Sequence, residues 1–144
     1  MKTTEETIIV SQEFSRSKAD VWKAITEPSQ MKQWFFENMP DFKAEVGFET
    51  QFLITHEERH FTHCWKIIKV IPEERITYEW NYTEHSGNAH VIFELEEQGD
   101  QTKLTVTNLV LEDFPDDIPE FKRESCVGGW EYFIQGNLKT YLDA

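Results

Sequence analysis

The feature that most constrains the fold is a period of two in hydrophobicity that extends from Phe42 to Leu111. Such alternation is typical of strands that bury one face, so the successive runs predict an antiparallel meander. A similar segment at residues 8–14 predicts a first strand. The residues expected to point inward along the meander are Phe48, Thr50, Phe52 and Ile54, then Phe61, His63, Trp65 and Ile67, then Ile76, Tyr78, Trp80 and Tyr82, then Ala89, Val91, Phe93 and Leu95, and finally Leu104, Val106 and Asn108.

Polar segments between these runs predict the hairpin turns. If Phe52 shares a face with His63, the numbers of paired residues must sum to an odd total, and the loop must then contain two or four residues. We therefore expect Glu58-Arg59 to form a two-residue turn. Further turns are expected at residues 84–88 and 98–100.

Two short helices are predicted between the first strand and the meander. Ser17 and Asp20 have the spacing of a helix N-terminal cap, and the apolar residues that follow recur at helical spacing until Pro28. A second helix is expected to begin at Pro28 or Ser29 and to end near Asn38.

A long helix is predicted at the C-terminal end, from a start marked by Asp117, Pro119 and Glu120 to about Leu142. The pair Gly128-Gly129 inside it costs about 1 kcal/mol per glycine relative to alanine, so we expect it to serve a bend or a close approach to the sheet. The stripe expected to face the sheet contains Trp130, Phe133, Ile134, Asn137, Leu138 and Tyr141.

This order of elements defines an α+β fold class in one domain over residues 1–144. A curved antiparallel sheet is expected to wrap around the long C-terminal helix, with the two short helices after the first strand closing one end. Where inward side chains do not meet across the gap, such a sheet leaves a cavity.

Several segments resemble the START-like SRPBCC superfamily, and most closely its branch named after the activator of the heat-shock protein 90 ATPase. The resemblance covers about residues 7–142 and implies a helix-grip fold with a ligand cavity between the sheet and the C-terminal helix. Such folds host lipid carriers, polyketide cyclases, hydrolases and co-chaperones. Trp65 replaces a smaller residue of the branch and is expected to fill part of the cavity. The segments are Val21–Pro28, Gln33-Trp34, Val46–Phe48, Lys69–Trp80 and Gly129-Trp130.

Charge and composition exclude several classes of function. The formal net charge of -13 repels nucleic acid and anionic lipid surfaces, so neither is expected as a partner. No apolar run approaches the ~20 residues that a membrane-spanning helix needs, and the first residues do not resemble a signal peptide. We therefore expect a cytoplasmic protein without membrane insertion, in which Cys64 and Cys126 are free thiols.

The aromatic residues supply the candidate ligand site, because aromatics make up 14% of the chain and many occupy inward positions. Tyr78 and Asn137 add polar atoms to otherwise apolar stripes, and His63 is expected to point into the cavity. The predicted ligand-binding residues are Phe52, His63, Trp65, Tyr78, Trp80, Phe93, Trp130, Phe133 and Asn137.

No metal or cofactor site is expected. The parity argument places His60 and His63 on opposite faces of one strand and His56 at the turn, so three imidazoles do not converge. Motifs for nucleotide binding, zinc hydrolysis and serine nucleophiles are missing from the sequence. The one catalytic candidate is His63 as a general acid or base, and the alternative is a structural histidine whose hydrogen bonds a neighbour satisfies.

Three functions therefore stay open. The leading hypothesis is a binding module for a small apolar or amphipathic molecule, with no enzymatic activity. The alternative is a co-chaperone or another protein-interaction domain, whose partner is a chaperone or a second copy of the chain. The third is a cyclase or hydrolase that uses His63.

Overall fold

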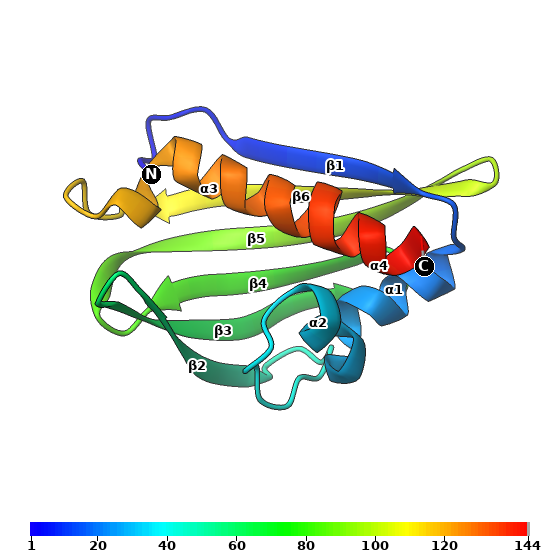
Figure 1. Cartoon of the computed structure of the whole chain (residues 1–144), viewed down its shortest axis with the longest axis horizontal. Helices are drawn as coiled ribbons and strands as arrows, with labels where there is room; N and C mark the ends of the chain where they lie inside the picture. The colour runs from blue at the N-terminus through cyan, green and yellow to red at the C-terminus, as the bar shows by residue number, and fades with distance from the viewer. Residues whose placement is uncertain (144) are drawn as a thin grey trace.

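One antiparallel sheet of six strands forms the body of the protein (Figure 1), which the computed structural model describes over residues 1–143. The strand order is β1-β6-β5-β4-β3-β2, so the first strand pairs with the last and the remaining strands follow the meander predicted from the alternation. The strands are β1 (Ile8–Phe14), β2 (Glu49–His56), β3 (Arg59–Ile71), β4 (Arg75–Tyr82), β5 (His85–Gln98) and β6 (Gln101–Glu112).

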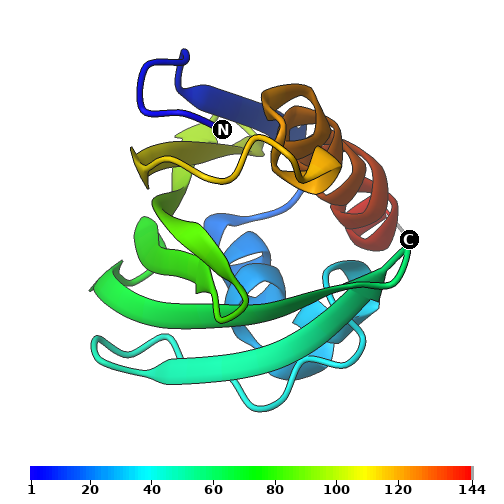
Figure 2. The same ribbon diagram turned by 90° about the vertical axis from the view of Figure 1, so that its left-hand side faces the viewer.

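A long helix crosses the concave side of the curled sheet (Figure 2), which confirms the predicted helix-grip class. It consists of α3 (Arg123–Trp130), the π-helical segment η2 (Glu131–Leu138) and α4 (Lys139–Asp143). Two short helices, α1 (Lys18–Thr26) and α2 (Pro28–Trp34), lie at one end of the sheet. No helix of the described residues is long and apolar enough to span a membrane.

The sequence predicted the start of α1 correctly but not the start of the long helix. Ser17 caps α1 as expected, because its hydroxyl accepts a hydrogen bond from the Asp20 amide at 3.1 Å. The predicted start of the long helix at Asp117 was wrong: a 3₁₀ turn, η1 (Pro119–Phe121), comes first, and the extended backbone of Lys122 separates it from α3. Burial of Phe121 holds this turn in place and outweighs the capping signal.

The first hairpin confirms the parity prediction but not the turn residues. Phe52 pairs with His63, an odd sum, yet the two-residue turn is Glu57-Glu58 because His56 pairs with Arg59. Both turn residues have the positive φ angles, 48° and 69°, that a type I′ turn requires.

The hairpin between β4 and β5 also differs from the expectation. Tyr82 pairs with His85, so the turn is Thr83-Glu84, and residues 86–88 belong to β5 instead of the turn. Gly87 is thus a strand residue, and its φ of +113° and the Phe114 ring stacked against it require glycine.

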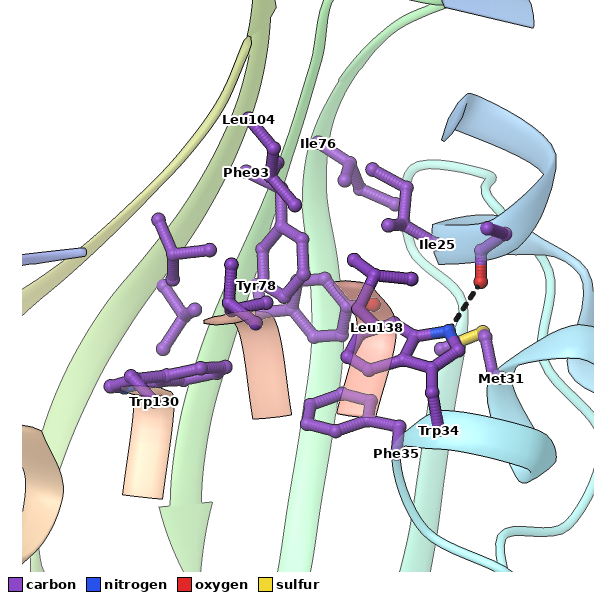
Figure 3. Close-up of a cluster of buried hydrophobic side chains, with 14 of the residues drawn as sticks. Ile25, Met31, Trp34, Phe35, Ile76, Tyr78, Phe93, Leu104, Trp130 and Leu138 are labelled. Atoms are coloured by element: carbon purple, nitrogen blue, oxygen red, sulfur yellow. Dashed lines mark hydrogen bonds between the residues drawn. The ribbon is translucent and has the colours of Figure 1, made fainter. Parts of the chain in front are cut away.

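The core is filled at the end of the sheet that α1 and α2 close (Figure 3). Side chains from the helices and from the sheet interdigitate there, and the Trp34 indole nitrogen donates to the Ala24 carbonyl at 2.8 Å. The buried residues labelled in the figure are Ile25, Met31, Trp34, Phe35, Ile76, Tyr78, Phe93, Leu104, Trp130 and Leu138. At the opposite end a smaller cluster joins Phe61, Ala89, Phe114 and Phe121.

Candidate ligand cavity

A cavity of about 710 Å³ lies between the concave face of the sheet and the long helix, and it separates the filled core from the small end cluster. This volume is within the range of small-molecule sites. Most of the lining is apolar or aromatic. The lining residues are Met1, Phe36, Ile54, His56, Phe61, His63, Trp80, Tyr82, Ala89, Asn108, Phe114, Glu120, Phe121, Cys126, Gly129, Trp130, Tyr132 and Phe133.

Four of the predicted ligand-binding residues lie in this lining: His63, Trp80, Trp130 and Phe133. They come from β3, β4, α3 and η2, so the topology brings both halves of the predicted site together. The Trp80 and Trp130 rings meet edge to face with their centroids 5.6 Å apart.

Four other predicted residues, Phe52, Trp65, Tyr78 and Phe93, are buried in the core beside the cavity and are not part of its lining. The Trp65 ring packs 4.9 Å from Trp80 and 5.2 Å from Tyr78, so it belongs to the filled end and the cavity stays open next to it. Among the described residues, Trp65 Nε1 and Tyr78 Oη are buried without a hydrogen-bond partner.

Asn137 lies apart from the cavity. Its side-chain nitrogen donates to the Trp34 carbonyl at 3.2 Å, and it lines a separate surface hollow beside α2. Asn137 therefore links η2 to α2 and does not face the cavity.

Several lining residues were not predicted. Asn108 is 5% exposed and lines the cavity. Its inward position in the strand alternation could have identified it as a candidate ligand-binding residue. Phe114 precedes the predicted long helix and Phe121 lies near its predicted start, and neither belongs to the predicted apolar stripe; their aromatic side chains were the hint of burial. Phe36 belonged to the predicted second helix, which ends at Trp34 instead of near Asn38, so the prediction of that helix end was wrong.

His63 is the most deeply buried polar side chain of β3 in the cavity wall, with 7% of its surface exposed. Its Nδ1 lies 3.0 Å from the Phe61 carbonyl oxygen. Since a carbonyl only accepts, Nδ1 carries the proton and Nε2 is left with a lone pair. Burial lowers the pKa of His63 to about 4, so the ring is neutral at pH 7 and a weak base. The rings within 6 Å of it are Phe36, Phe52, Trp80 and Tyr82.

Two other titratable groups of the lining are neutral as well. Burial raises the pKa of the Tyr82 phenol, whose oxygen accepts a hydrogen bond from Trp80 Nε1 at 2.9 Å. Burial also raises the pKa of the Cys126 thiol to about 12, so it is not a nucleophile at pH 7. Cys64 and Cys126 are free thiols, as predicted.

An ion pair closes the rim of the cavity between η1 and the β2–β3 hairpin. Arg59 donates to both oxygens of Glu120, from Nε at 2.9 and 3.1 Å and from Nη2 at 2.8 Å, and His56 Nδ1 lies 2.6 Å from the same carboxylate. Hydrogen bonds from Arg59 and then from His56 hold the pKa of Glu120 at about 2.

The histidines are separated as the parity argument predicted, because His60 is exposed and His63 is buried. Ligand atoms of His56, Glu57 and Glu120 do lie within 4.8 Å of one another at the rim. The Arg59 guanidinium is paired with both of these carboxylates.

The expectation that Gly128-Gly129 permits a close approach to the sheet was wrong. A Cβ added to either glycine would meet no atom within 4 Å. Gly129 borders the cavity, Gly128 is exposed, and the helix departs from α geometry directly after them, in η2.

The curved antiparallel sheet and the long helix on its concave side define a helix-grip protein, the class that the resemblance to the START-like SRPBCC superfamily implied. The sequence matches the family described as "Activator of Hsp90 ATPase homolog 1-like protein" over residues 15–143. The chain therefore belongs to this family. No curated protein matches the sequence.

Solved structures share the fold at low sequence identity. Protein CV1439 from Chromobacterium violaceum is 20% identical with a TM-score of 0.76, over 96% of this chain and 97% of that one. The Aha1 dimer from Colwellia psychrerythraea is 18% identical with a TM-score of 0.73, over 96% of both chains. DynU16, a protein of the dynemicin biosynthetic locus, is 22% identical with a TM-score of 0.75; this chain is covered over 97% and spans 48% of that chain.

Proposed function

We propose that the protein binds a small, largely apolar molecule in the cavity between the sheet and the long helix. The observation that carries the proposal is a chamber of about 710 Å³ whose walls are mostly aromatic and apolar. A chamber of this size leaves its lining without packing partners, and a bound apolar molecule would supply them. Trp80, Trp130 and Phe133 are proposed to contact the ligand, and His63 and Asn108 to orient it.

The test fills the cavity from the helix. Gly129→Leu places a side chain into the chamber, whereas Gly128→Leu places the same side chain on the exposed face one residue earlier. Both substitutions replace a helical glycine and should gain about 1 kcal/mol of helix propensity, so both variants are expected to fold.

Binding is measured by quenching of tryptophan fluorescence and by the rise in melting temperature with a panel of uncharged polycyclic aromatics and sterols. The wild type and Gly128→Leu are expected to bind alike, and Gly129→Leu at least about tenfold more weakly. Equal affinity of all three proteins, or no binding to the wild type by any compound of the panel, would overturn the proposal.

A second candidate is binding to a chaperone, which the family description suggests for its namesake. The observation in its favour is a group of exposed apolar residues on the outer face of β1 and β6: Ile9, Leu109 and Leu111. The same surface is a candidate contact for a second copy of the chain. This function is preferred if no panel compound binds and purified chaperone does.

Reaction chemistry at His63 is less well supported, because a histidine with a pKa of about 4 is a weak base at neutral pH. A cytoplasmic location and the exclusion of nucleic acid remain proposals that rest on the net charge of -13.

A further inference from the structure

The imidazole of His63 presents one polar atom to the cavity that nothing in the described part of the chain satisfies. Nδ1, the ring nitrogen next to Cβ, is bound to the Phe61 carbonyl. Nε2 therefore lies on the far side of a ring that lines the cavity, and no described residue donates to it. The side chain is only 7% exposed, yet Nε2 is not among the buried atoms that lack a hydrogen-bond partner, so this lone pair is open to the cavity. A ligand that covers Nε2 without donating to it would leave a buried acceptor unpaired.

The charges of the lining decide which ligands such an acceptor would tolerate. No lysine or arginine side chain lines the cavity among the described residues, and the Arg59 guanidinium at its rim is paired with Glu120. The N-terminal ammonium of Met1, a lining residue, already donates to the Phe121 carbonyl and lies 3.8 Å from the Glu5 carboxylate. A carboxylate on the ligand would therefore face the Nε2 lone pair and the Glu120 carboxylate, and each of these two cations, the Met1 ammonium and the Arg59 guanidinium, is already paired. A hydroxyl group would instead donate its proton to Nε2.

We infer that the cavity selects an uncharged, predominantly aromatic molecule that carries a hydroxyl group, and that this hydroxyl donates a hydrogen bond to His63 Nε2. The inference rests on the proposed binding function and adds the chemical class of the ligand to it. The ring part of the molecule stacks against Trp80 and Trp130, which line the same chamber.

The test compares 1-hydroxypyrene with its methyl ether, 1-methoxypyrene, in which a methyl group replaces the hydroxyl proton that can be donated. The wild type is expected to bind 1-hydroxypyrene about tenfold more tightly, the effect of leaving a buried acceptor unpaired. His63→Phe keeps a ring in contact with Phe52 and should bind the two probes with about equal affinity. His60→Phe, on the exposed face of the same strand, should retain it.

A measurement on the wild type keeps the test independent of whether His63→Phe folds. Nitrogen-15 NMR of the histidine rings should identify His63 as the tautomer protonated at Nδ1. Its Nε2 resonance should shift with 1-hydroxypyrene and stay in place with 1-methoxypyrene. Unchanged Nε2 resonances with both bound probes would overturn the inference.

The outcomes separate this inference from the proposed function. Equal binding of both probes, or tighter binding of 1-pyrenebutyrate, leaves a ligand-binding cavity but overturns the selection of a hydroxyl group. If neither pyrene binds while other compounds of the panel bind in a manner sensitive to Gly129→Leu, the inference fails and the proposed function stands.

Discussion

Gly87 lies directly against Phe114, a residue of the cavity lining. It lies in β5 with a φ of +113°, a conformation that side chains of L-amino acids rarely adopt. The ring of Phe114 occupies the space where its Cβ would be, so backbone geometry and packing both require a glycine.

We predict that Gly87→Ala lowers the free energy of unfolding by about 2–4 kcal/mol, the sum of a strained backbone and an overpacked contact. Gly99→Ala is the matched control, because Gly99 also has a positive φ, +63°, but nothing lies within 4 Å of its added Cβ. It should lose only about 1–2 kcal/mol. Urea denaturation measures both; equal losses would show that the Phe114 contact adds nothing.

At this scale the sequence predicts which residues point inward but not which of them meet empty space. Trp65 and Trp80 occupy equivalent inward positions and pair across β3 and β4, yet only Trp80 lines the cavity. The difference depends on where the helices lie over the sheet, and the strand alternation carries no information on that placement.

The contact between η1 and the β2–β3 hairpin is the element-scale feature with a clear pH dependence. Glu120 has a pKa of about 2 in the folded protein, chiefly because of hydrogen bonds from Arg59, against an ordinary value of 4.5. Between about pH 2 and pH 4.5 the unfolded chain therefore binds more protons than the folded protein does. The stabilisation is fully present above about pH 4.5 and is lost as the pH falls toward 2.

We predict that Glu120→Gln lowers the free energy of unfolding by about 1 kcal/mol at pH 7, the range of partly exposed ion pairs. The difference from the wild type should shrink as the pH falls from 4.5 to 2.5 in urea titrations. Arg59→Gln should weaken the same pH dependence, because the guanidinium is its main cause. A difference that stays constant with pH would contradict this assignment.

Local patterns predicted the strands and α1 because their signals, alternation and a capping serine, act within a few residues. The start of the long helix was missed for the opposite reason. Phe121 is buried by residues far away in the sequence, Phe61 among them, and that contact sets where η1 ends and α3 begins. The hairpin turn differs from the prediction by one residue; in the observed register Arg59 and His56 both reach Glu120.

At the scale of the whole molecule, a net charge of -13 acts against compactness. Salt at 0.1 M screens interactions beyond about 10 Å and should relieve this repulsion more than it weakens exposed ion pairs. We predict that raising NaCl from 10 to 300 mM raises the melting temperature by about 2–4 °C, or roughly 1 kcal/mol. Near the isoelectric pH the rise should be smaller. A melting temperature that falls with salt would indicate that ion pairs dominate.

The division of the interior into a filled end and a hollow end has an evolutionary consequence. Tight packing beneath α1 and α2 supports the fold, so we expect most substitutions there to destabilise the protein. Residues around the cavity have free space beside them, as at Gly129, and can change size with little effect on folding. Ligand preference can thus diverge between lineages by drift at one end of the molecule while the other end preserves the architecture.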